Sequence, residues 1–169
     1  MERDGMTADE SEKSAAVALL QNWLMGLGGV FVLIGGAVAA VASPLSLNKG
    51  SWLAAYLVLV AGVPLYLVGQ FIAHWLVDRG GWALLAGWNL GNAAVIAGSL
   101  WSLPLLVDVG GVVLLIPLGY LLWIAVRRKG AASGAGRGFA EAARWLFIAA
   151  LIIMIFSIPI GLILAHLRA

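Results

Sequence analysis

Residues 24–42 read LMGLGGVFVLIGGAVAAVA, and this stretch of 19 residues without a charged side chain decides the fold class. An α-helix rises 1.5 Å per residue, so a helix over this stretch is about as long as the ~30 Å hydrocarbon core of a bilayer. Four more apolar runs of similar length follow it along the chain. They are Leu53–Leu76, Ala83–Leu103, Val109–Val126 and Leu146–Leu167. The sequence therefore predicts an all-α integral membrane protein, a bundle of five transmembrane helices.

The tryptophans support this interpretation, because an indole ring prefers the headgroup level of a membrane. Seven of the eight tryptophans stand at or near the ends of the apolar runs. They are Trp23, Trp52, Trp75, Trp82, Trp101, Trp123 and Trp145. Residues 23–167 form the predicted transmembrane domain, and residues 1–22 a short segment before it. That segment is rich in acidic residues, unlike a secretion signal, so we expect the first helix to be retained.

Basic residues cluster in one place, the Gly-rich loop at residues 127–144. It holds Arg127, Arg128, Lys129, Arg137 and Arg144. Short positive loops stay in the cytoplasm. Alternation of five spans then places the N-terminus in the cytoplasm and the C-terminus outside. We expect the cell membrane as the location, with a bacterial inner membrane as the most natural setting.

Small residues at four-residue spacing predict where helices approach one another, because lipid tails give no hydrophobic drive for association and close backbone contact does. The first run carries two such pairs, Gly36 with Ala40 and Gly35 with Ala39. The third carries Gly87 with Gly91 and Ala94 with Gly98. We expect these positions to lie in helix contacts, either within one chain or between copies. Prolines inside three of the runs, Pro64, Pro117 and Pro159, predict kinks.

One polar constellation stands out inside the apolar runs. Tyr66, Gln70 and His74 follow one another at four-residue spacing in the second run, which places them on one helix face. Asn89 and Asn92 lie three residues apart in the third run, at matching depth. Amides in hydrocarbon need hydrogen-bond partners. The five residues therefore line a small polar pocket between the second and third spans, with His74 near the inner interface. Alternatively, Tyr66, Gln70, Asn89 and Asn92 bond one another and only join two helices.

The apolar runs contain few side chains that could carry out catalysis, and we do not expect an enzyme. The chain has no cysteine, and no pair of carboxylates lies within a run. The two histidines, His74 and His166, are predicted to lie near opposite surfaces of the membrane. One chain therefore cannot hold a haem between them, and no bis-histidine haem is expected. A haem with His74 as single axial ligand is also not expected, which leaves no predicted cofactor. No catalytic or metal site is predicted.

Two function classes remain open from the sequence. The leading one is a non-enzymatic, multi-pass accessory or assembly subunit of a larger membrane complex. The alternative is a small oligomeric transporter or channel-like protein that uses the polar pocket. The expected partners are membrane lipid and other membrane subunits or copies of the chain itself. Nucleic acid is not expected, since the formal net charge is only +2 and the basic residues are explained by topology.

Overall fold

The computed structural model describes the backbone of residues 2–76, 79–127 and 137–167, and the side chains of residues 10–76, 79–127, 141–142 and 144–160. All regular structure in these residues is helical. The elements are α1 (Glu2–Ala42), α2 (Gly50–Tyr56), the π-helix η1 (Leu57–Gly62), α3 (Val63–Phe71), the 3-10 helix η2 (Ala73–Trp75), α4 (Arg79–Leu100), α5 (Pro104–Arg127) and α6 (Arg137–Leu167). They group into two compact units, residues 1–86 and residues 87–169.

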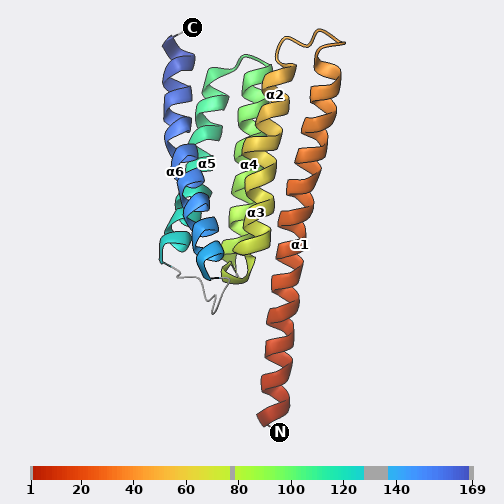
Figure 1. The fold of residues 1–169 in the computed structure, drawn as a ribbon, viewed down its shortest axis with the longest axis vertical. Helices are drawn as coiled ribbons and strands as arrows, with labels where there is room; N and C mark the ends of the chain where they lie inside the picture. The colour runs from red at the N-terminus through yellow and green to blue at the C-terminus, as the bar shows by residue number, and fades with distance from the viewer. Residues whose placement is uncertain (1, 77–78, 128–136, 168–169) are drawn as a thin grey trace. The chain divides into compact units, whose positions relative to one another are not determined.

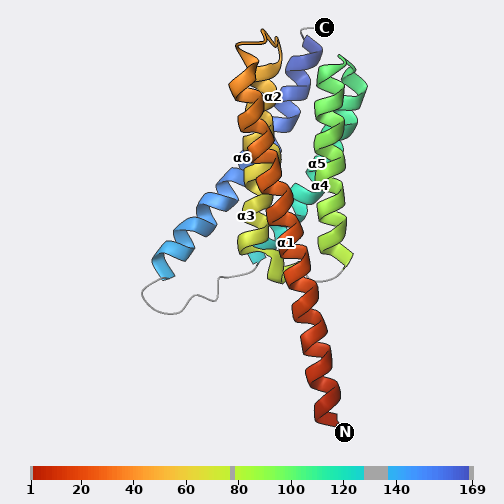
Figure 2. The same cartoon turned by 90° about the vertical axis from the view of Figure 1, so that its right-hand side faces the viewer.

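The first unit is built on the long helix α1, which lies alongside α2, η1 and α3 (Figures 1 and 2). A tight turn after α1 reverses the chain. Ser46 adopts a left-handed conformation there (φ 51°), and the amide of Leu47 donates to the carbonyl of Ala42 at 2.9 Å. This six-to-one hydrogen bond is the usual way in which a helix end satisfies its last carbonyls. The N-terminal part of α1 continues beyond the end of α3 (Figure 1).

The second apolar run forms three consecutive helical segments instead of one uniform helix. α2 is followed directly by the π-helix η1, and α3 begins at Val63, one residue before Pro64. Proline has no N–H to donate, so a regular ladder cannot pass through this position. The amide of Val63 instead reaches back five residues to the carbonyl of Val58. The π-turn thus absorbs the irregularity that the sequence indicates at Pro64.

The second unit contains the rest of α4 together with α5 and α6. A short turn joins α4 to α5: Ser102 has a positive φ of 55°, and the amide of Leu103 donates to the carbonyl of Gly98 at 2.8 Å. Pro104 then opens α5, where its fixed φ suits the first turn of a helix. α6 packs against α5, and Ile148 and Leu151 of α6 are buried.

Four helical stretches are long and apolar enough to cross a membrane, by length and composition, within the part of the chain that is described. They are Glu10–Ala42, Gly50–Phe71, Arg79–Leu100 and Pro104–Arg127. A shorter apolar stretch, Arg144–Ile160, belongs to α6. Large apolar side chains face outward on these helices: Leu33, Leu105 and Ile116 are 74%, 78% and 71% exposed. Such a surface suits hydrocarbon and not water, so the protein is a helical membrane protein, as the sequence predicts.

Candidate functional site

The polar residues of the second run lie on the outer surface of the first unit. Tyr66 is 41% exposed, and Gln70, one turn further along α3, is exposed as well. The α-helix ends at Phe71, and His74 belongs to the 3-10 helix η2, where its ring lies 4.4 Å from the ring of Trp75. A 3-10 helix turns by 120° per residue instead of 100°, so the four-residue pattern does not continue regularly to His74.

The polar residues of the third run differ sharply in burial. Asn89 is half-buried, whereas Asn92 is only 1% exposed and lies beside the fully buried Trp88. The Asn92 side-chain amide Nδ2 donates to the carbonyl of Trp88, one turn earlier, at 2.8 Å. The carbonyl oxygen Oδ1 of Asn92 is buried and has no hydrogen-bond partner. A buried acceptor without a donor is costly, and functional positions are one place where proteins tolerate it.

The two sets of polar residues therefore belong to different units. Tyr66 and Gln70 share the exposed side of α3 in the first unit, and Asn89 and Asn92 lie on α4 in the second. The pocket that would combine them stays a prediction. The residue with the most unusual environment is Asn92. The sequence signal for it is an amide inside an apolar run, and Asn89 shares that signal.

Glycines set the closest helix contacts in the first unit. A Cβ atom added at Gly28 of α1 would lie 2.6 Å from the Tyr66 backbone nitrogen and 2.8 Å from the Gly62 carbonyl oxygen. The contact is reciprocal, because a Cβ at Gly62 would lie 3.0 Å from the Gly28 carbonyl. Gly35 approaches α2 and η1 in the same way, because a Cβ there would lie 2.6 Å from Val58 Cγ2 and 3.0 Å from the Ala54 carbonyl oxygen. α1 therefore uses Gly28 and Gly35, seven residues apart, to meet the second run backbone to backbone.

The glycines of the second unit close the contact between α4 and α5. A Cβ at Gly91 would lie 2.7 Å from Leu114 Cγ, and one at Gly110 would lie 2.8 Å from the Val95 backbone nitrogen. Gly87 makes an ordinary contact with Pro117, 3.9 Å from its Cδ. Of the predicted packing residues, Gly91 thus lies in a tight helix contact and Gly87 in a looser one.

Two more of the predicted packing residues, Gly36 and Ala40, face outward on α1. A Cβ at Gly36 would have open space around it, as it would at Gly26 and Gly29. Ala40 is exposed. Gly26, Gly29, Leu33, Gly36 and Ala40 recur at alternating spacings of three and four, so they share one face of the helix. We call these five residues the outer face of α1. Gly36, at its edge, also borders the second run, whereas Gly28 and Gly35 are in close contact with that run.

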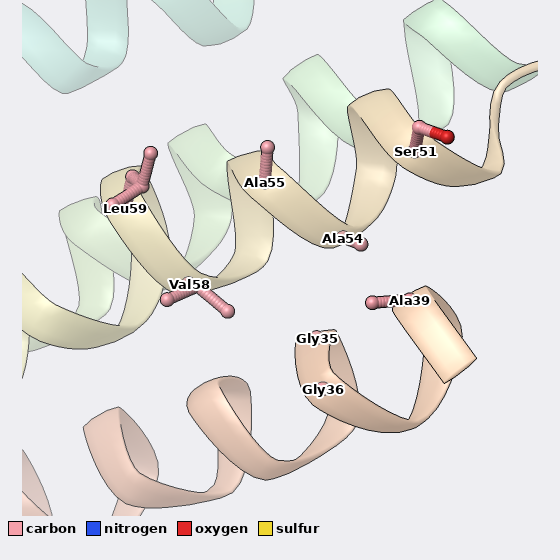
Figure 3. Close-up of a pocket in the computed structure, with 8 residues that line it drawn as sticks. All are labelled: Gly35, Gly36, Ala39, Ser51, Ala54, Ala55, Val58 and Leu59. Carbon is pink, nitrogen blue, oxygen red and sulfur yellow. The ribbon is translucent and has the colours of Figure 1, made fainter. Parts of the chain in front are cut away.

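A groove opens between α1 and the start of the second run (Figure 3). Its volume is about 360 Å³, and its walls are small and apolar apart from one hydroxyl. The lining residues are Gly35, Gly36 and Ala39 of α1, and Ser51, Ala54, Ala55, Val58 and Leu59 of α2 and η1. Ser51 lies at the end of the groove nearest the α1–α2 turn, and Leu59 at the opposite end (Figure 3).

Arginines and tryptophans meet at one end of the second unit. The Arg127 guanidinium lies 4.8 Å from the centroid of the Trp123 ring at the end of α5. The Nε of Arg144 donates to the carbonyl of Ala125 at 3.1 Å, and its guanidinium lies 5.5 Å from the Trp145 ring. Cations near the last turn of a helix compensate its free carbonyls. Arg144 therefore ties the start of α6 to the end of α5.

Comparison with protein-family models, curated proteins and solved structures gives no match for this chain. Among the described residues, no three His, Cys, Asp or Glu side chains come together as a metal site. The class of the protein follows from its helices alone: a helical membrane protein whose first helix carries glycines on two distinct faces.

Proposed function

We propose that this protein is a non-enzymatic accessory or assembly subunit of a larger membrane complex, and that the outer face of α1 receives a transmembrane helix of another subunit. The observation that carries this proposal is the division of the glycines of α1. Gly28 and Gly35 are used within the chain, whereas Gly26, Gly29 and Gly36 have open space where a side chain would be.

An exposed face of small residues is suited to helix association. In lipid, helices associate by close backbone approach and dispersion contacts, which Cβ-less positions permit. Leu33 rises between Gly29 and Gly36 and is 74% exposed, so it offers a side chain for a groove on the neighbouring helix. A protruding leucine between two glycines is suited to packing against another helix, whereas contact with lipid tails does not require such a surface.

Purification from native membranes in mild detergent tests the proposal, with the mass of the intact particle as the readout. We expect a second protein in stoichiometric amount. We also expect Gly29→Leu to release it, because a leucine fills the hollow without disturbing the first unit. Ala55→Leu, on α2 and away from the outer face, is the matched control and retains the partner. A particle that contains this chain alone contradicts the proposal.

The proposed topology has five spans, with α6 as the fifth, the N-terminus in the cytoplasm and the C-terminus outside. α6 has 31 residues, which is about 46 Å of helix and more than a bilayer needs. The basic residues at 127–144 support a cytoplasmic loop before it. A reporter enzyme that is active only outside the cytoplasm, fused to the C-terminus, tests this arrangement.

The second candidate function is a small oligomeric transporter or channel-like protein. The observation that favours it is Asn92, whose Oδ1 is buried without a donor. A π-helix in the second run adds support, since π-turns in helices occur frequently at functional sites. Swelling of proteoliposomes in glycerol, urea and potassium acetate tests it. Passage of one solute through the wild-type protein, lost in Asn92→Leu, supports transport, and equal swelling of protein-free liposomes contradicts it.

A further inference from the structure

We propose that the groove between α1 and the α2–η1 segment holds one acyl chain of a phospholipid, whose phosphate group lies beside Lys49. This assignment goes beyond the proposed function, because it concerns a small ligand and a groove that shares only Gly36 with the outer face of α1. It rests on the size of the groove, on the chemistry of its walls and on the charge at one end.

The length of the groove fits a hydrocarbon chain. From Ser51 to Leu59 the wall rises about 12 Å, which is most of one ~15 Å leaflet. The groove is open along one side, and its volume is about 360 Å³. An extended chain of methylenes carries no side chains, so it can lie along this wall over its whole length.

The walls select an apolar occupant. Glycine and alanine supply five of the eight lining residues, and valine and leucine two more. A bound water needs two to four polar partners, but the side chains offer one hydroxyl, that of Ser51 at the end of the groove (Figure 3). The floor is closed by the contact of Gly35 with Val58 and with the Ala54 carbonyl. The groove is thus open to lipid along its length and closed below by the contact between α1 and the second run.

The end nearest the α1–α2 turn carries the charge that a phospholipid requires. Lys49 is the single charged residue between Lys13 and Asp78, and it precedes Ser51 by two positions. Trp52 is 41% exposed, and its ring lies 5.2 Å from that of Tyr56. Exposed tryptophans mark the headgroup level, so Lys49 lies where phosphates lie. An ammonium group and a phosphate attract one another at this level.

Native mass spectrometry of the full-length protein, purified from its membrane in mild detergent, tests the assignment. We expect the wild-type protein to carry one phospholipid. Ala39→Leu combined with Ala55→Leu fills the groove from both walls, and we expect it to lose the lipid. Gly119→Leu is the matched control, since it adds the same side chain on α5, where a Cβ meets open space outside both the groove and the outer face of α1. Equal lipid content in the filled variant and the control would overturn the proposal.

Lys49 has its own test in the same measurement. Lys49→Gln removes the charge, and we expect about a five-fold loss of lipid occupancy, whereas Lys49→Arg keeps it. Equal occupancy in Lys49→Gln and the wild-type protein would overturn the placement of the phosphate.

A photoreactive amino acid at position 55, activated in intact membranes, separates the possible occupants. A lipid adduct supports the proposal. An adduct with a second copy of the chain, or with another protein, overturns it, and leaves the test of the outer face of α1 unaffected.

Discussion

Replacing Gly28 with alanine should separate α1 from the second run. The new Cβ would lie 2.6 Å from the Tyr66 backbone nitrogen, whereas ordinary contact begins at 3.4 Å, so the helices must move apart by about 0.8 Å. A gap of that size costs a quarter to a half of each atom pair's ~0.1–0.2 kcal/mol. For roughly 40–60 affected pairs, as many as one buried leucine makes, the loss is about 1–6 kcal/mol. Overpacked cores typically lose ~1–3 kcal/mol, so we expect about 2–3 kcal/mol.

The assay is reversible unfolding in mixed micelles with increasing mole fraction of sodium dodecyl sulfate, followed by circular dichroism. A loss of 2–3 kcal/mol lowers the ratio of folded to unfolded protein about 30- to 150-fold. Gly29→Ala is the matched control, because it makes the same change one residue away, where a Cβ meets open space. If Gly28→Ala proves as stable as Gly29→Ala, the close contact of α1 with α3 is refuted.

Three further predictions concern the second unit, and the same unfolding assay checks each of them. Asn92→Leu should leave stability unchanged or raise it by about 1 kcal/mol, because it removes a buried oxygen without a donor; a large loss would mean that the oxygen is satisfied. Gly110→Ala should cost about 1–3 kcal/mol by pushing α5 from α4, while Gly119→Ala, where a Cβ has open space, should not. Arg144→Met should lower the free energy of unfolding by about 1 kcal/mol, since it keeps the aliphatic stem but loses the hydrogen bond to the Ala125 carbonyl. An unchanged midpoint of unfolding would mean that this hydrogen bond does not stabilise the protein.

The general architecture could be predicted from the sequence, because in hydrocarbon every backbone polar group must be satisfied, and a helix does so within its own segment. A continuous apolar run of about 20 residues therefore favours a helix, and the described part of the chain has four helices of this kind. The tight contact at Gly91 was also within reach of the spacing rule, since small residues four apart favour close helix approach.

The inward face of α1 could not be chosen from the sequence. Glycines and alanines occur all around this helix, so the four-residue rule selects Gly36 and Ala40 as readily as Gly35 and Ala39. The contact within the chain uses Gly35 together with Gly28, seven residues away. Which glycine faces inward depends on where Gly62 lies across the interface, and that depends on the π-turn before Pro64.

The regular spacing of Tyr66, Gln70 and His74 assumed one continuous α-helix to Leu76. The change to a 3-10 helix after Phe71 breaks this assumption: the amide of Trp75 donates to the Ile72 carbonyl three residues back instead of to a carbonyl four residues back. The burial of Asn92 was equally beyond the sequence, because its neighbour Asn89 has the same side chain and lies only half-buried on the same helix.

The central claim is that α1 binds its own chain on one face and another transmembrane helix on the other. A photoreactive amino acid, whose adduct needs no particular side chain on the neighbour, can be placed at single positions along α1 and activated in native membranes. We expect cross-links to a neighbouring protein from positions 26, 29, 33, 36 and 40, and none from Ile34 or Val41, which are exposed elsewhere on the helix. Cross-linking without this periodicity, or none at any position, would contradict the account.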